Sequence, residues 1–128
     1  MIRNLKNVLG MFALLSLSAG SYADNLFDLT VQSVTNGFGA VIPDQLQLNI
    51  VARKSVSITD IVLNEGNCTV RGTVESVYDT LYDGAEPKEA FPLTMGMGDG
   101  EELFIYCENL IQAEFQTTRG NIVYEFSY

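Results

Sequence analysis

The sequence predicts an all-β fold: an antiparallel β-sandwich of seven or eight strands, held by one disulfide and preceded by a signal-peptide helix. Three observations predict this architecture. Apolar residues recur at period two along most of the chain, which is typical of strands with one buried face. Gly, Pro, Asn and Asp interrupt these segments at short intervals, as tight turns require. Two cysteines follow an export signal, which favours a disulfide.

The N-terminal segment, residues 1–23, has the layout of a cleaved signal peptide. Arg3 and Lys6 give it a positive start, residues 8–17 form an apolar run, and small residues supply a cleavage site. The apolar run is about half of the roughly 20 residues that span a bilayer. We therefore expect an exported protein, periplasmic or secreted, with one domain over residues 24–128 and no stable membrane anchor.

Eight segments of the remaining chain carry strand patterns. Alternation is clearest in Leu46–Ala52 and Ile122–Tyr128, where every second side chain is apolar and defines a buried face. Thr118–Asn121 supplies a glycine for a positive backbone φ, so the chain is expected to end in a hairpin. In chain order the predicted strands are Phe27–Val34, Leu46–Ala52, Val56–Leu63, Thr69–Val77, a short one near Phe91–Met95, Leu103–Cys107, Ile111–Gln116 and Ile122–Tyr128.

The stretch from Tyr78 to Ala90 has several acids, a glycine, a proline and no clear period. We expect a long connection there that can include a helical turn, and no apolar stripe of convincing length in the chain has helical spacing.

Cys68 and Cys107 are the only cysteines. In an oxidising compartment they allow one intramolecular pairing. Their separation is unlike the Cys-x-x-Cys spacing of redox catalysts. A bridge closing a loop of about 40 residues is worth about 4 kcal/mol in the chain-entropy model. We predict a structural disulfide.

The composition excludes several chemistries. The chain has no His, so it holds no Ser-His-Asp or Cys-His nucleophilic site and no His-ligated zinc, and two cysteines cannot form a four-thiolate site. Removing residues 1–23 takes away two bases and no acid, which changes the net charge from −9 to −11. Such a chain avoids the phosphate backbone of nucleic acids, and its electrostatic partner would be a basic protein. We expect no cofactor.

Three stretches resemble exported bacterial immunoglobulin-like domains: Ile61–Cys68, Gly100–Leu103 and Thr117–Tyr128. They correspond to a strand that ends in a turn, a Gly-Glu entry into a later strand, and a closing hairpin. The resemblance covers about the last 70 residues and implies an immunoglobulin-like sandwich. Antibody-type domains also bury a Trp, and this chain has none. The resemblance therefore concerns the fold and implies no function.

The candidate partner-binding residues lie in and beside the irregular connection. If that connection is a surface loop, its aromatic and Met side chains form an apolar patch suited to a protein partner; alternatively, they pin the loop to the core. Nearby acids would steer a basic partner. The sequence thus predicts a non-catalytic envelope protein that binds another protein as an accessory module, through this patch or by strand addition to a sheet edge. The candidates are Tyr78, Tyr82, Asp83, Glu86, Glu89, Phe91, Met95 and Met97.

Other readings stay open. The protein could inhibit a basic hydrolase such as a lysozyme, with the loop acids facing its cleft. Aromatics at Tyr124, Phe126 and Tyr128 resemble the last strand of an outer-membrane barrel, but eight strands of about 9–11 residues would leave almost no chain for turns. A carboxylate-based hydrolase would need two converging acids in a pocket. The acidic stretches Asp79–Asp83 and Gly98–Glu102 offer oxygen ligands for calcium but are expected to be solvated turns with no metal.

Overall fold

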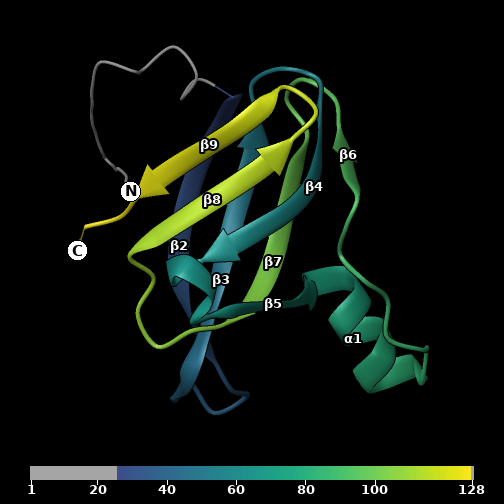
Figure 1. Cartoon of the computed structure of the whole chain (residues 1–128). Coiled ribbons are helices and arrows are strands. Elements are labelled where there is room, and N and C mark those ends of the chain that lie inside the picture. The colour runs from purple at the N-terminus through teal and green to yellow at the C-terminus, as the bar shows by residue number, and fades with distance from the viewer. Residues whose placement is uncertain (1–25, 128) are drawn as a thin grey trace.

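The computed structural model describes residues 26–127 as two antiparallel four-stranded sheets packed face to face, with a helix at one side (Figure 1). The predicted all-β fold class is confirmed. The predicted signal peptide, residues 1–23, lies outside the described residues. Within these, no helix has the length and apolar character needed to cross a membrane. The first sheet has the order β2 (Phe27–Thr35), β3 (Val41–Ala52), β7 (Gly100–Tyr106), β5 (Thr69–Thr73), and the second the order β6 (Leu93–Met95), β4 (Val56–Leu63), β8 (Gln112–Thr117), β9 (Gly120–Glu125).

The strand order is that of a constant-type immunoglobulin domain. When β2, β3, β4, β5, β7, β8 and β9 take the letters A to G in chain order, the sheets read A-B-E-D and C-F-G, which is the constant-type arrangement. The strand left over, β6, lies between D and E in the chain and pairs with the free side of β4. The similarity is one of architecture.

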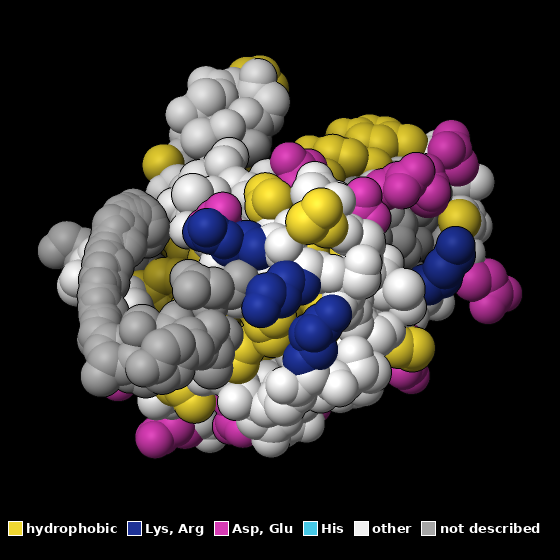
Figure 2. All heavy atoms as spheres, turned by 90° about the horizontal axis from the view of Figure 1, so that it is seen from above, with side chains coloured by type: hydrophobic (Ala, Val, Ile, Leu, Met, Phe, Trp, Pro, Cys, Tyr) yellow, Lys and Arg dark blue, Asp and Glu magenta, His cyan; other side chains and the backbone are white. Residues whose placement is uncertain are grey.

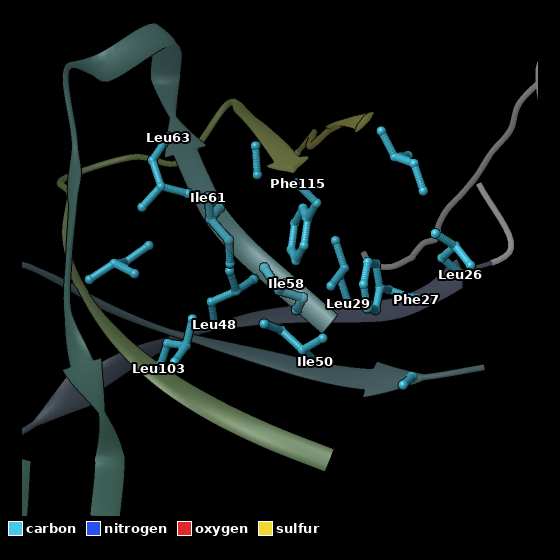
Figure 3. Close-up of a cluster of buried hydrophobic side chains, with 14 of the residues drawn as sticks. Leu26, Phe27, Leu29, Leu48, Ile50, Ile58, Ile61, Leu63, Leu103 and Phe115 are labelled. Carbon is cyan, nitrogen blue, oxygen red and sulfur yellow. The ribbon is translucent and has the colours of Figure 1, made fainter. Parts of the chain in front are cut away.

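The core lies between the two sheets, where the alternating apolar residues of both meet (Figure 3). Leu48 of β3 and Leu103 of β7 are fully buried and face Ile58 of β4. At one end of the core the rings of Phe27 and Phe115 pack with centroids 4.9 Å apart. Since Leu103 is on the inner face of β7, its neighbour Phe104 is on the outer face of the same strand.

The predicted disulfide is present. Cys68 and Cys107 are bonded, with their Cα atoms 5.1 Å apart. The bond joins the start of β5 to the end of β7, where Thr69 pairs with Tyr106 in the same sheet. It therefore staples two neighbouring strands, unlike the bond between the two sheets in antibody domains.

Asn64 ties the turn after β4 to the loop before β8. Its side-chain nitrogen donates to the carbonyl of Asn109 at 2.8 Å, and its Oδ1 accepts from the backbone N–H groups of Ile111 and Gln112 at 2.8 and 3.0 Å. The residue begins the short 3-10 turn η2 (Asn64–Gly66) with a φ of +48°, a region in which Asn is enriched. One side chain thus holds two loops together.

The predicted strand Thr69–Val77 begins where expected but extends too far, and the expected lack of a helix is wrong. β5 ends at Thr73, and α1 runs from Val74 to Asp83. Thr73 Oγ1 accepts from the backbone N–H of Ser76 at 3.2 Å, which caps the helix, and Gly84 ends it in the left-handed conformation. Thr and Val dominate residues 69–77, and their strand preference favours the wrong assignment. The apolar positions 74, 77, 78, 81 and 82 do have helical spacing.

A second local difference concerns β3. Pro43–Asp44 has the residue types of a turn and precedes the expected strand Leu46–Ala52, but β3 begins earlier, at Val41, and continues through both residues. Asp44 has a φ of +65°, and the pairing with β2 shifts in register beyond Leu46. An irregularity within the strand therefore takes the place of the turn.

Candidate functional site

The helix α1 stands beside the sandwich and covers part of its outer face next to β5 and β7 (Figure 1). Val77 is buried on its inner side, and Gly72 of β5 leaves room for it. The Tyr78 ring meets Phe104 edge-on, with centroids 5.8 Å apart. These contacts fix the helix on the sheet without using all of its apolar side chains.

The exposed side chains of α1 are both apolar and acidic. Leu81 is 56 % exposed and Tyr82 is 79 % exposed, while the Tyr78 and Tyr82 rings lie 5.8 Å apart. No Lys or Arg lies on the helix. We term this set the α1 surface, which consists of Glu75, Tyr78, Asp79, Leu81, Tyr82 and Asp83.

Charge is unevenly distributed over the molecule. From Glu75 to Glu102 the chain has eight acids and a single base, Lys88. Figure 2 looks onto the strand ends at the top of Figure 1, where Lys and Arg side chains gather. Arg119 is held there, since its Nε donates to the carbonyl of Ser55 at 2.7 Å. The helix α1 and the connection after it, residues 75–90, hold five of these acids and Lys88, whereas Asp99 lies beside the basic strand ends, where its carbonyl accepts from the Ala52 N–H.

The structure distributes the predicted partner-binding residues over surface and core. Tyr78 and Tyr82 come together on α1, and Asp83, Glu86 and Glu89 are exposed at its end and in the following connection. Phe91 is half-buried against the core, and Met95 is 1 % exposed within β6. Met97 is 76 % exposed in the turn between β6 and β7. Phe91 and Met95 therefore occupy the position expected under the alternative interpretation, in which these side chains pin the connection to the core.

An open depression of about 410 Å³ lies between the start of α1 and the paired ends of β3 and β7. Burial raises the pKa of Glu101 above its ordinary value of 4.5, and the negative charges of Glu75, Asp99 and Glu102 raise it further. No group of three or more His, Cys, Asp or Glu among residues 26–127 is arranged to hold a metal ion. The lining residues are Asn49, Ile50, Val51, Val74, Glu75, Gly100, Glu101 and Glu102.

Among the exposed apolar residues that lie outside the predicted site are Leu81 and Phe38, which is at the tip of the hairpin between β2 and β3. Phe38 at this tip is 97 % exposed. Asn36 Oδ1 accepts from the backbone N–H groups of Phe38 and Ala40 at 2.8 and 3.1 Å, so the tip is held in one shape. The sequence does contain a feature that could have indicated an apolar surface at this hairpin: the stretch between Asp28 and Asp44 has no charged residue in an otherwise acidic chain.

Comparison with known proteins found no matching family model, no matching curated protein and no matching solved structure. The function is therefore argued from these surfaces alone.

Proposed function

We propose that this chain is a non-catalytic, exported envelope protein that binds a basic protein partner through the α1 surface. One observation carries the proposal: Leu81 and Tyr82 are exposed on a helix that has acids and no base. Exposed aromatic and aliphatic side chains surrounded by charges of one sign are typical of a binding site with central anchors and a polar rim.

The energetics support this use of the helix. Full burial of a large apolar side chain is worth about 1.5–3 kcal/mol relative to full exposure. Leu81 is 56 % exposed, so about half of this gain is left for a partner to provide. Exposed acids add little affinity but raise the rate of encounter with a cationic surface, and salt screens their effect. Binding should therefore depend on the apolar anchors for its lifetime and on the acids for its speed.

The proposed export rests on the signal-peptide pattern of residues 1–23. The Cys68–Cys107 bond supports it, since oxidising compartments preserve disulfides. Kinship with exported immunoglobulin-like domains is part of the same proposal, and the shared A-B-E-D and C-F-G strand order supports it.

Capture from an envelope extract of the producing cells tests the proposal. Immobilised residues 24–128 are compared with a Leu81→Ser/Tyr82→Ser variant and with Phe38→Ser, a control that removes an even more exposed aromatic side chain elsewhere. We expect one basic protein to be retained by the unaltered chain and by Phe38→Ser, and to be lost with the double variant. Retention that does not change with the double variant, or an acidic captured protein, contradicts the proposal.

Inhibition of a basic hydrolase is the second candidate, and the exposure of Asp83, Glu86 and Glu89 favours it. Hen egg-white lysozyme is a suitable cationic probe. Inhibition of cell-wall lysis by the unaltered chain, but not by Asp83→Asn/Glu86→Gln/Glu89→Gln, would identify this activity. Lysis at an unchanged rate counts against inhibition of this enzyme.

A further inference from the structure

The outer face of the β2-β3-β7-β5 sheet carries an ordered array of polar and aromatic side chains. Cross-strand pairing places Thr30 beside Asn49 and Gln32 beside Gln47. On the other side of β3, Gln47 is opposite Phe104 of β7, over which Tyr78 of α1 packs. We term Thr30, Gln32, Gln47 and Asn49 the polar floor. It lies beside the aromatic side chains of Phe104 and Tyr78.

Hydrogen bonds fix the orientation of this floor. The Asn49 nitrogen donates to Thr30 Oγ1 at 3.0 Å and to Gln32 Oε1 at 2.9 Å, while Asn49 Oδ1 accepts from Gln47 Nε2 at 2.8 Å. The Asn49 amide therefore uses both of its hydrogens and one lone pair internally. Among the described residues, this leaves both Nε2 hydrogens of Gln32, the Oε1 of Gln47 and the hydroxyl hydrogen of Thr30 to a ligand. The face presents donors and acceptors in a fixed pattern.

The aromatic side of the array is also held in place. Tyr106 of β7 is 48 % exposed, and the Arg71 guanidinium lies 5.7 Å from its ring centroid. Arg71 in turn donates to Gln45 Oε1 at 3.2 Å. The ring of Tyr106 is therefore supported on one side and open to a ligand elsewhere. At the other end of the same face the depression beside Asn49 and Glu102 begins.

We propose that this face, with Thr30, Gln32, Gln47 and Tyr106 as its contact residues, binds a neutral oligosaccharide. Sugar hydroxyls donate and accept, so they fit amide groups that offer both functions without charge. The C–H faces of pyranose rings pack against exposed aromatic rings. A preorganised array loses little conformational entropy on binding. The contact residues Thr30, Gln32 and Gln47 are a hydroxyl and two amides and Tyr106 is a phenol, which favours a neutral occupant. The charged side chains of this face lie at its margins: Glu102 is opposite Asn49, and Arg71 is beside the Tyr106 ring.

This inference goes beyond the proposed protein binding and uses other contact residues, although Tyr78 of the α1 surface also packs over Phe104 beside them. The α1 surface depends on Leu81 and Tyr82, which are not part of the floor. A glycan site on the sheet would hold the chain against an envelope polysaccharide while the helix remains available to a protein. If glycan binding is not observed, the proposed protein binding through the α1 surface is unaffected, and the reverse also holds.

The test is titration of isotope-labelled residues 24–128 with three soluble probes: chitotetraose, cellotetraose and maltotetraose. We expect at least one probe to give saturable shifts of the side-chain amide signals of Gln32 and Gln47, at an affinity insensitive to salt. Tyr106→Ala and Gln47→Ala should each weaken binding at least tenfold, whereas Tyr106→Phe keeps the ring and should bind. Gln116→Ala removes a matched amide from the other sheet and should change nothing.

The proposal is overturned if none of the three probes causes saturable shifts at about 10 mM, or if Gln116→Ala weakens binding as much as Gln47→Ala does. Thermal unfolding of each variant confirms that it is folded, and Tyr106→Phe guards against a merely structural effect of Tyr106→Ala. The same mixtures are assayed for new reducing ends. Their release, abolished by Glu101→Gln, would refute the non-catalytic function while leaving glycan binding in place.

Discussion

Replacement of Asn64 should destabilise the fold far more than its position in an exposed turn suggests. Its side chain makes three hydrogen bonds to backbone groups of the loop before β8, each worth about 1 kcal/mol net. Asn64→Ala also puts an alanine at a φ of +48°. Alanine lacks the short polar side chain that makes this conformation tolerable for Asn, so the substitution costs about 1 kcal/mol more in the free energy of unfolding. We therefore expect a loss of about 4 kcal/mol in the free energy of unfolding, or about 16 °C in Tm at about 4 °C per kcal/mol.

Two further variants separate these contributions. Asn64→Gly tolerates the positive φ and should lose only about 3 kcal/mol, the part due to the hydrogen bonds. Asn67→Ala is the matched control, since Asn67 lies in the same turn with a φ of −83° and donates one exposed side-chain hydrogen bond, to the carbonyl of Asn64. It should lose less than about 1 kcal/mol.

The assay is urea unfolding followed by circular dichroism at 25 °C without reductant, so that the disulfide stays intact. Equal m values for all variants would show that the comparison is between similar states. A loss for Asn64→Ala no larger than that for Asn67→Ala refutes the reasoning, because water would then replace the three bonds at no cost.

Two more predictions concern the disulfide and the acidic depression. Replacing Cys68 and Cys107 by Ser should lower the free energy of unfolding by about 4 kcal/mol, the loop-closure entropy of the unfolded chain; urea unfolding that changes by less than about 1 kcal/mol would contradict this. Glu101→Gln should raise Tm at pH 7, because a raised folded-state pKa means that the ionised carboxylate destabilises the folded state. The advantage should vanish as the pH falls below the ordinary glutamate pKa of 4.5, where Glu101 is protonated in both the folded and the unfolded state. A Tm difference that is constant from pH 4 to 8 would contradict this.

Much of the fold can be predicted from local patterns. The alternation in Leu46–Ala52 predicts which face of the strand is buried, and the turn that contains Gly120 predicts the closing hairpin. Both features depend only on residues that are close in sequence. The helix α1 was not predicted, although its apolar spacing is present. β-branched residues favour a strand there, and only the end of pairing between β5 and β7 at Thr73 releases the chain into a helix.

The candidate sites were less predictable than the fold. Met95 and Tyr82 are alike as apolar residues near one irregular stretch, yet one is buried in β6 and the other is exposed on α1. The difference in exposure between Met95 and Tyr82 depends on which side of β6 and which side of α1 faces the core. The exposed ring of Phe38 follows a stretch without charges, but its exposure depends on how far the hairpin extends beyond its neighbours.

The amino-acid sequence by itself determined the alternating faces of the strands, the two cysteines available for pairing, the acidic charge and the absence of histidine chemistry. These are properties of residue type and short-range order. The tertiary structure alone decided that Thr30, Gln32, Asn49 and Gln47 form one hydrogen-bonded array beside the aromatic side chains of β7 and α1. Residues of β2, β3 and β7 meet there only because strands far apart in the chain pair in a specific register, and a shift of one residue would turn each of them to the opposite face.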